Sequence, residues 1–155
     1  MPADRPAAGL SAQDPPEIRL VIPGDALAVR AALQGLTLAL GHRGISEPDR
    51  GTAEIVLAEV LNNIVEHAYQ SAAGEIEVTI RLGPSALDCR VADSGHPMPG
   101  GLLPAGAPPP LPPEGELAEG GYGWYLIRSL SQDLRYCRDR DRNLLCFRLA
   151  VAAPG

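Results

Sequence analysis

Short stretches in which hydrophobic and polar residues alternate predict five strands. The clearest covers residues 75–82, where every second residue is isoleucine, valine or leucine and the residues between them are polar. This alternation is typical of a strand that buries one face. The next strand ends at Asp93, which falls on the same face as the hydrophobic residues before it. The predicted strands span about residues 17–22, 75–82, 87–93, 133–138 and 143–151.

Other stretches repeat their hydrophobic residues with the period of a helix. Asp25 is suited to cap the first helix and Gly41 to end it. A loop at residues 44–49 separates it from a longer helix, which Gly74 ends. The predicted helices span about residues 25–40, 52–72 and 122–130.

The order of these elements predicts the class of fold. They follow one another as β-α-α-β-β-α-β-β, so strands and helices are grouped and do not strictly alternate. We therefore expect a two-layer α/β sandwich, with a mixed, mostly antiparallel sheet and helices on one face. The sandwich should form a single domain over residues 17–152. Residues 1–16 have no periodicity and are expected to form a flexible N-terminal arm.

A long stretch without periodicity, residues 94–120, interrupts the second half of the domain. It contains eight of the 16 prolines of the chain. A loop of this length inside a compact domain is typically either disordered or a functional lid.

Composition excludes several classes of function. A formal net charge of -6 over 155 residues argues against a nucleic-acid partner. All 13 basic residues are arginine, which excludes mechanisms that need a P-loop or Schiff-base lysine. The three cysteines are widely spaced and predict neither a disulfide framework nor a zinc site. No apolar run resembles a signal peptide or membrane span, so we expect a cytoplasmic protein without a membrane partner.

The first candidate motif lies on the long second helix. Glu59, Asn63 and His67 are spaced four residues apart and form a polar row along the border of its buried stripe. An amphipathic helix whose polar border has these residues by chance explains the row as well as a functional site does. His67 is better explained by helix packing or hydrogen bonding than by metal binding.

The second candidate is Asp93-Ser94-Gly95, at the end of a strand. A carboxylate that faces a core needs a donor, because an unpaired buried charge is costly. Gly95 allows another group to approach the backbone closely. Taken alone, an ordinary turn explains these three residues better.

The third candidate is the glycine-rich stretch 120–123, directly before the last helix. Free backbone N–H groups and the positive end of the helix dipole suit such a place to binding anions. By itself this signal is weak, and it is not a dinucleotide-binding fingerprint, because it follows a loop and has no third glycine in register.

Together and in this order, the motifs are far more specific. Glu59-x-x-x-Asn63-x-x-x-His67-Ala68, then Asp93-x-Gly95, then Gly121-x-Gly123 resembles the N, G1 and G2 boxes of the GHKL (Bergerat-fold) ATPases. Within that superfamily, the stretches EVLNNIVEHAY and GGYGWYLIRSLSQDLRY resemble the anti-sigma-factor serine kinases of bacterial partner-switching systems. The resemblance spans about residues 17–151 and implies a histidine-kinase-like ATPase fold with a lid at about 94–120.

The resemblance implies that ATP binds between these boxes. Asp93 would accept a hydrogen bond from the adenine amine, which supplies the donor that its buried position requires. Gly95 would let the base lie close to the chain. Gly121 and Gly123 would offer backbone N–H groups to the phosphates.

The resemblance also implies a Mg²⁺ ion and a catalytic base. Asn63 would bind the Mg²⁺ that bridges the phosphates, and a carboxamide oxygen suits that cation. Glu59, one turn earlier, would orient or deprotonate the attacking hydroxyl or water. The expected activity is phosphorylation of a serine on an antagonist (anti-anti-sigma-like) protein, together with sequestration of a sigma factor or similar regulator.

The predicted lid contains no arginine, which qualifies the expected kinase activity. No arginine lies between Arg90 and Arg128, although a cation near the γ-phosphate is expected in a kinase. Arg128 either supplies this cation from the last helix or is an ordinary surface residue. A nucleotide-gated binding module without phosphoryl transfer, or a simple ATPase domain, is therefore an alternative to the kinase.

The helix over 25–40 is apolar over a wide arc, which indicates either a homodimer or partner interface or a crowded core.

Overall fold

Five antiparallel strands form a single sheet in the computed structural model, which describes residues 16–69, 74–106 and 123–152. The strand order is β1-β2-β3-β5-β4, and each of the four pairings is antiparallel. The strands are β1 (Glu17–Pro23), β2 (Glu75–Leu82), β3 (Ala86–Asp93), β4 (Gln132–Asp139) and β5 (Arg142–Ala150). All five predicted strands are confirmed, and no parallel pair occurs among the strands described.

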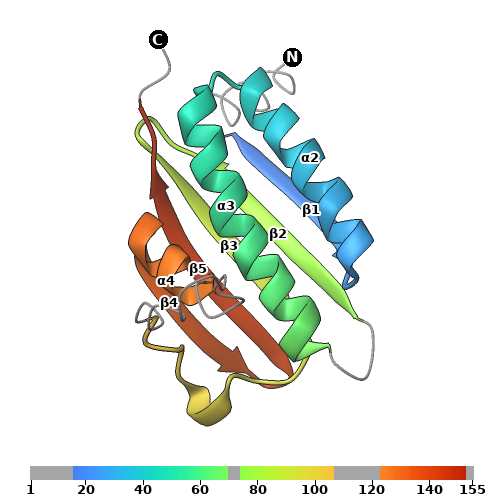
Figure 1. Cartoon of the computed structure of the whole chain (residues 1–155). Coiled ribbons are helices and arrows are strands. Elements are labelled where there is room, and N and C mark those ends of the chain that lie inside the picture. Colours follow the sequence, from blue (N-terminus) through green and yellow to red (C-terminus); the bar gives the residue numbers. More distant parts are fainter. Residues whose placement is uncertain (1–15, 70–73, 107–122, 153–155) are drawn as a thin grey trace, which may run out of the picture.

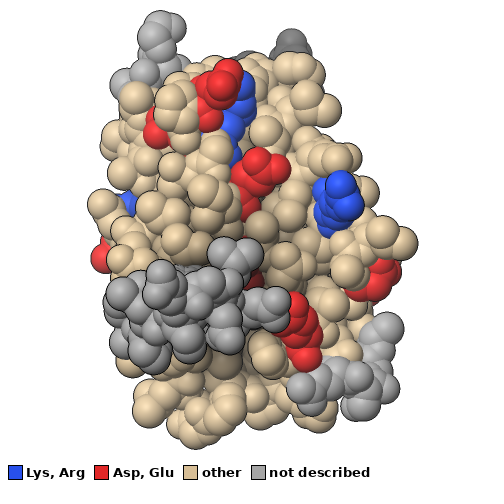
Figure 2. Space-filling model, viewed as in Figure 1, with Lys and Arg blue, Asp and Glu red and all other residues tan. Residues whose placement is uncertain are grey.

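The helices cover one face of this sheet (Figure 1). They are α2 (Ala26–His42), α3 (Glu47–Asn63) and α4 (Gly123–Leu130). The α3 helix lies across the middle of the sheet, between α2 and α4 (Figure 1). The predicted two-layer α/β sandwich is therefore confirmed. Figure 2 shows that the surface over the helices carries few charged side chains.

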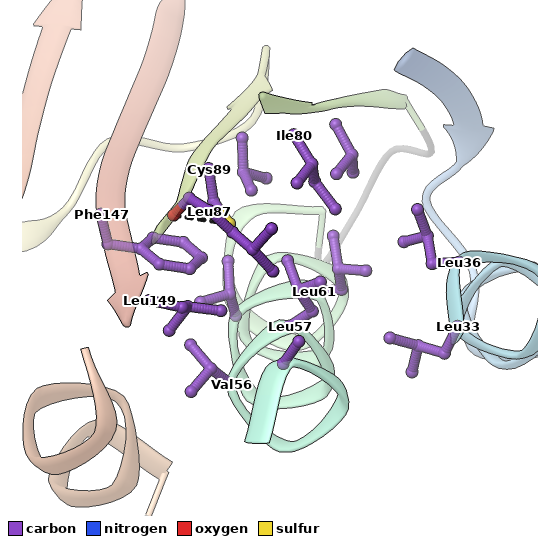
Figure 3. Packing of buried hydrophobic residues seen from close by; sticks show 14 of the residues in the cluster. Leu33, Leu36, Val56, Leu57, Leu61, Ile80, Leu87, Cys89, Phe147 and Leu149 are labelled. Atoms are coloured by element: carbon purple, nitrogen blue, oxygen red, sulfur yellow. Dashed lines mark hydrogen bonds between the residues drawn. The ribbon is translucent and has the colours of Figure 1, made fainter. Parts of the chain in front are cut away.

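The hydrophobic core lies between α3 and the central strands. Figure 3 shows Leu57 and Leu61 of α3 pointing toward Leu87 and Cys89 of β3. These four side chains are at most 3% exposed. Burial raises the pKa of the Cys89 thiol to about 12, so this cysteine is a neutral core residue.

The long helix begins five residues before its predicted start. Ser46 caps α3 by accepting a hydrogen bond from Asp49 N at 3.3 Å, and Pro48 occupies the first turn, where its missing N–H costs nothing. The predicted loop at 44–49 is therefore wrong for residues 47–49. By contrast, Asp25 caps α2 as predicted and accepts from Ala28 N at 2.8 Å.

The long helix also ends differently from its predicted form. The α-helical pattern stops at Asn63, and a π-helical turn follows at Ile64–Ala68. A π-turn holds one more residue than an α-turn, so it rotates the residues after Asn63 out of the α-helical phase. The predicted residues 70–72 of this helix lie outside the described residues.

Two further predictions also fall largely outside the described ranges. These are the N-terminal arm, of which only Pro16 is described, and residues 107–120 of the predicted lid. The described first part of the lid, 94–106, contains a single 3₁₀ turn at Pro99–Gly101. None of the helices in the described ranges is both long and apolar enough to pass through a membrane.

Candidate functional site

A cavity of about 430 Å³ lies beneath the C-terminal end of α3. Its walls come from the end of α3, the loop after β3, the start of α4 and the β4–β5 hairpin. It has the size of a small-molecule site. A second hollow, of about 570 Å³, lies on the outer face of the sheet and contains none of the predicted site residues. The first is lined by Val60, Asn63, Ile64, His67, Ala68, Asp93, His96, Pro97, Met98, Pro99, Trp124, Tyr136, Asn143 and Leu145.

Asp93 is a buried carboxylate at the wall of this cavity. It ends β3 between Ile76 of β2 and Asn143 of β5, and only 4% of the residue is exposed. Its Oδ1 accepts two hydrogen bonds of 2.8 Å, from Gly95 N and from Asn143 Nδ2. Among the described residues, no donor contacts Oδ2. The alternation along β3 predicted the inward direction of this side chain correctly.

Asn143 is a site residue that the sequence analysis missed. Its amide oxygen accepts from the Tyr136 hydroxyl and from Arg138 Nη1, the latter at 3.1 Å. Its amide nitrogen donates to Asp93 and to His96 O, at 2.8 and 2.9 Å. No local signal marked it, because its partner on β3 lies 50 residues away in the chain.

Glycine is required at position 95 because the backbone of Ala68 leaves no room for a side chain there. A Cβ atom at this position would lie 2.4 Å from Ala68 O, which no real Cβ approaches. The neighbouring His96 N donates to the same carbonyl at 2.9 Å. The chain after β3 therefore lies directly against the end of the π-helical turn. The predicted close approach of a base at Gly95 stays a prediction.

Tyr69 ties the same two segments together. Its hydroxyl accepts from Ser94 N at 2.8 Å and donates to Glu75 O at 2.7 Å. Burial is the main reason why the pKa of Tyr69 is raised, so the hydroxyl keeps its proton at neutral pH. The ring also fills the space beside Gly24 and Gly74.

Glu59, Asn63 and Gly123 lie close together beside the cavity. A Cβ atom at Gly123 would lie 2.8 Å from Glu59 Oε1 and 3.7 Å from Asn63 Nδ2. Asn63 lines the cavity, whereas Glu59 and Gly123 are not part of its wall. Two motifs 60 residues apart in the chain thus meet at one place. Gly121 lies outside the described residues.

The buried amide of Asn63 has no hydrogen-bond partner at Nδ2 among the described residues. The two ends of an amide are nearly isosteric, so a half turn places the oxygen where the nitrogen lies. An amide oxygen is a ligand type that Mg²⁺ accepts. In the described ranges, no cluster of three or more histidine, cysteine or acidic side chains offers a metal site of its own.

His67 does not extend the row of Glu59 and Asn63 into the core. It lies in the π-helical turn, where its side chain is 69% exposed and 3.8 Å from the Glu66 carboxylate. It contributes to the cavity wall from this exposed position. Of the two roles expected for His67, helix packing is therefore wrong, and hydrogen bonding stays a prediction.

Arg128 is engaged with the described part of the predicted lid. Its Nε donates to Pro104 O at 2.8 Å. A Cβ atom at Gly106 would lie 2.8 Å from Arg128 Cδ and 2.9 Å from Trp124 O, so this segment packs tightly on α4. No arginine lines the cavity within the described part of the chain.

Comparison with known proteins identifies relatives over nearly the whole chain. Residues 22–149 match the histidine kinase-like ATPase domain. The chain is 32% identical over 133 residues to serine-protein kinase RsbW of Bacillus mycoides, covering 83% of this chain and 82% of that protein. RsbW of Bacillus cereus matches at the same identity and coverage.

The fold is also found in a solved structure. The crystal structure of the RsbU and RsbW domains of a Mycobacterium tuberculosis protein superimposes with a TM-score of 0.64 at 17% identity. The match covers 90% of this chain but only 33% of that longer chain. At this identity the likeness concerns the fold alone.

The contact between Gly95 and Ala68 yields a prediction about stability. In Gly95→Ala the new methyl group meets a backbone carbonyl that cannot move aside, so we expect a loss of about 2 kcal/mol in the free energy of unfolding. Gly35→Ala is the matched control, because nothing lies within 4 Å of its Cβ position in α2. There alanine should stabilise the helix by about 0.5–1 kcal/mol. Urea unfolding of both variants measures the difference, and equal stabilities would contradict the close packing.

Proposed function

The chain belongs to the histidine kinase-like ATPase family and is homologous to the serine-protein kinases RsbW, and on this basis we propose that it binds ATP with Mg²⁺ and phosphorylates a serine of a protein substrate. The substrate is a small antagonist protein of the anti-anti-sigma kind. In its absence the kinase holds a second partner, such as a sigma factor.

The observation that carries this proposal is the meeting of three motifs at one cavity. The buried carboxylate of Asp93 faces the cavity at its wall, and Asn63 lines it as well. Glu59 and Gly123 lie directly beyond Asn63. Such an arrangement suits a nucleotide whose base meets Asp93 and whose phosphates extend toward Asn63.

Each group has a role that fits its chemistry. Asp93 accepts a hydrogen bond from the exocyclic amine of adenine. Gly123 opens α4, and a helix N-terminus favours phosphate. Asn63 holds Mg²⁺, which neutralises charge on the phosphates when it is bound. Glu59 accepts the proton of the serine hydroxyl as that oxygen bonds to the γ-phosphorus, while the bond from this phosphorus to the bridging oxygen breaks and ADP leaves.

Exposed leucines on α2 support a role in protein assembly. Leu27 and Leu38 are 79% and 66% exposed and lie 11 residues apart, which places them on the same side of the helix. The buried residues of α2 occupy the other side. The apolar surface of α2 is thus wider than the part that is buried in the core. We propose that the exposed side of this helix contacts a second copy of the chain or a partner protein.

A binding module without phosphoryl transfer is the second candidate. The specific observation in its favour is that, in the described ranges, no arginine lines the cavity and Arg128 is bonded to Pro104. Transfer without a nearby cation would be slow, because charge develops at the γ-phosphate. Nucleotide binding alone could then control the partner.

ATP binding should depend on Asp93 and on divalent metal. In Asp93→Asn the remaining oxygen keeps the bonds from Gly95 and Asn143, while an amide nitrogen replaces the acceptor that faces the adenine amine. We expect a loss of about 2 kcal/mol, or roughly 30-fold in affinity, by isothermal titration. Asp88→Asn makes the same change on the exposed side of β3 and serves as the control. Unchanged affinity in Asp93→Asn, or in EDTA, would refute the nucleotide assignment.

Phosphoryl transfer should depend on Glu59. Glu59→Gln keeps the shape of the side chain but removes proton acceptance, so ATP should still bind while transfer falls by about 10²–10⁴. A radiolabelled ATP assay with the cognate antagonist measures this, and Glu54→Gln on the exposed side of α3 is the control. If the wild type transfers no phosphate but binds its partner in an ATP-sensitive way, the binding module is correct.

Assembly should depend on the outer side of α2. Leu27→Glu and Leu38→Glu each place a charge on this side without disturbing buried residues, so we expect loss of the dimer or partner complex in light scattering and pull-down. Val21→Glu is the control, since Val21 is 52% exposed in β1. A strict monomer at high concentration, with no partner recovered by the wild type, would remove the basis for this surface.

A further inference from the structure

The amide of Asn143 has only one orientation that satisfies its contacts. Two donors point at its oxygen, the Tyr136 hydroxyl and Arg138 Nη1. Three acceptors face its nitrogen, Asp93 Oδ1, His96 O and, at 3.4 Å, Gly95 O. A flipped amide would put its nitrogen against two donors and its oxygen against three acceptors. The flip is therefore strongly unfavourable for a residue that is only 6% exposed.

This fixed amide in turn fixes the Asp93 carboxylate. Asn143 Nδ2 and Gly95 N both donate to Oδ1 at 2.8 Å, which holds the carboxylate plane and occupies one of its two oxygens. Oδ2 receives no donor among the described residues. A ligand in the cavity therefore meets an oxygen that can accept a hydrogen bond but cannot rotate away.

We propose that Tyr136 and Asn143 are positioning residues that set the base selectivity of the cavity, by holding Asp93 Oδ2 as a fixed acceptor. This inference rests on the proposed nucleotide binding. A base with an exocyclic amine at this place gains a hydrogen bond. A base with a carbonyl there places two acceptors against each other, which a fixed carboxylate cannot relieve.

The same hairpin also holds the loop after β3, which forms part of the cavity wall. Met98 N donates to the Tyr136 hydroxyl at 3.0 Å, and Arg138 Nη1 donates to Gly95 O at 2.7 Å. With the Asn143 bond to His96 O, the ends of β4 and β5 bind the loop at three points. Tyr136 therefore acts on the loop and on Asn143 through one hydroxyl.

The test compares ATP with inosine triphosphate, in which a carbonyl replaces the exocyclic amine of the base. The wild type should bind ATP at least tenfold more tightly. In Asn143→Ala the carboxylate keeps only the hydrogen bond from Gly95 N and can rotate, so ATP affinity should fall about tenfold while inosine triphosphate affinity changes little or rises. The affinity ratio then approaches one. A purely structural role would weaken both nucleotides equally and leave the ratio unchanged.

Tyr136→Phe is the second variant, because it keeps the ring and removes only the hydroxyl. It should lower the ratio about threefold, since Arg138 still donates to Asn143. Arg142→Gln is the control on the same hairpin, where Arg142 pairs with Glu77 on the outer face. It should keep the wild-type ratio.

The outcomes separate this inference from the proposed function. If the wild type binds ATP selectively and both variants keep its ratio, the positioning role is wrong and the proposed function stands. If the wild type binds neither nucleotide, both fail. Should Asn143→Ala not fold, the ratio in Tyr136→Phe decides, and an unchanged ratio there overturns the proposal.

Discussion

A carboxylate removed from water at the end of β3 is the constraint on which the rest of the site depends. An isolated charge in such a place is costly, so the surrounding chain has to supply donors. Two reach Asp93 Oδ1, one from the backbone two residues on and one from the neighbouring strand β5. The second needs its own support, which comes from Tyr136 and Arg138 of β4. One buried charge therefore organises three strands and a loop.

The opposite wall of the site is organised by close backbone contact. The π-helical turn after Asn63 brings Ala68 O against Gly95 and His96 N, and Tyr69 bonds to Ser94 N. A single wide turn can shift the residues after it without ending the helix. The residues of α3 before the turn can therefore pack in the hydrophobic core, and the residues within the turn can contact the loop after β3.

The sequence was most informative wherever a property depends on neighbours along the chain. The alternation in residues 75–82 and 87–93 located two strands and predicted that Asp93 points inward. The start of α3 was not predicted, because residues 44–49 were assigned to a loop, whereas Ser46 caps the helix and Pro48 lies in its first turn. The π-turn left no trace in the sequence, because the hydrophobic period does not report one extra residue per turn. Asn143 could not be found either, since its importance arises from a strand pairing that only the folded sheet defines.

The turn between β4 and β5 consists of only Arg140 and Asp141, and Arg140 adopts a left-handed φ of 57°. This turn determines that Arg138 is paired with Asn143. Surface turns ordinarily tolerate insertions and deletions. Here a change of one residue in length would slide β4 along β5 and move Tyr136 and Arg138 to the wrong side of the sheet. The length of this exposed turn therefore shapes the pocket as directly as the residues that line it, although neither of its side chains lies in the cavity wall.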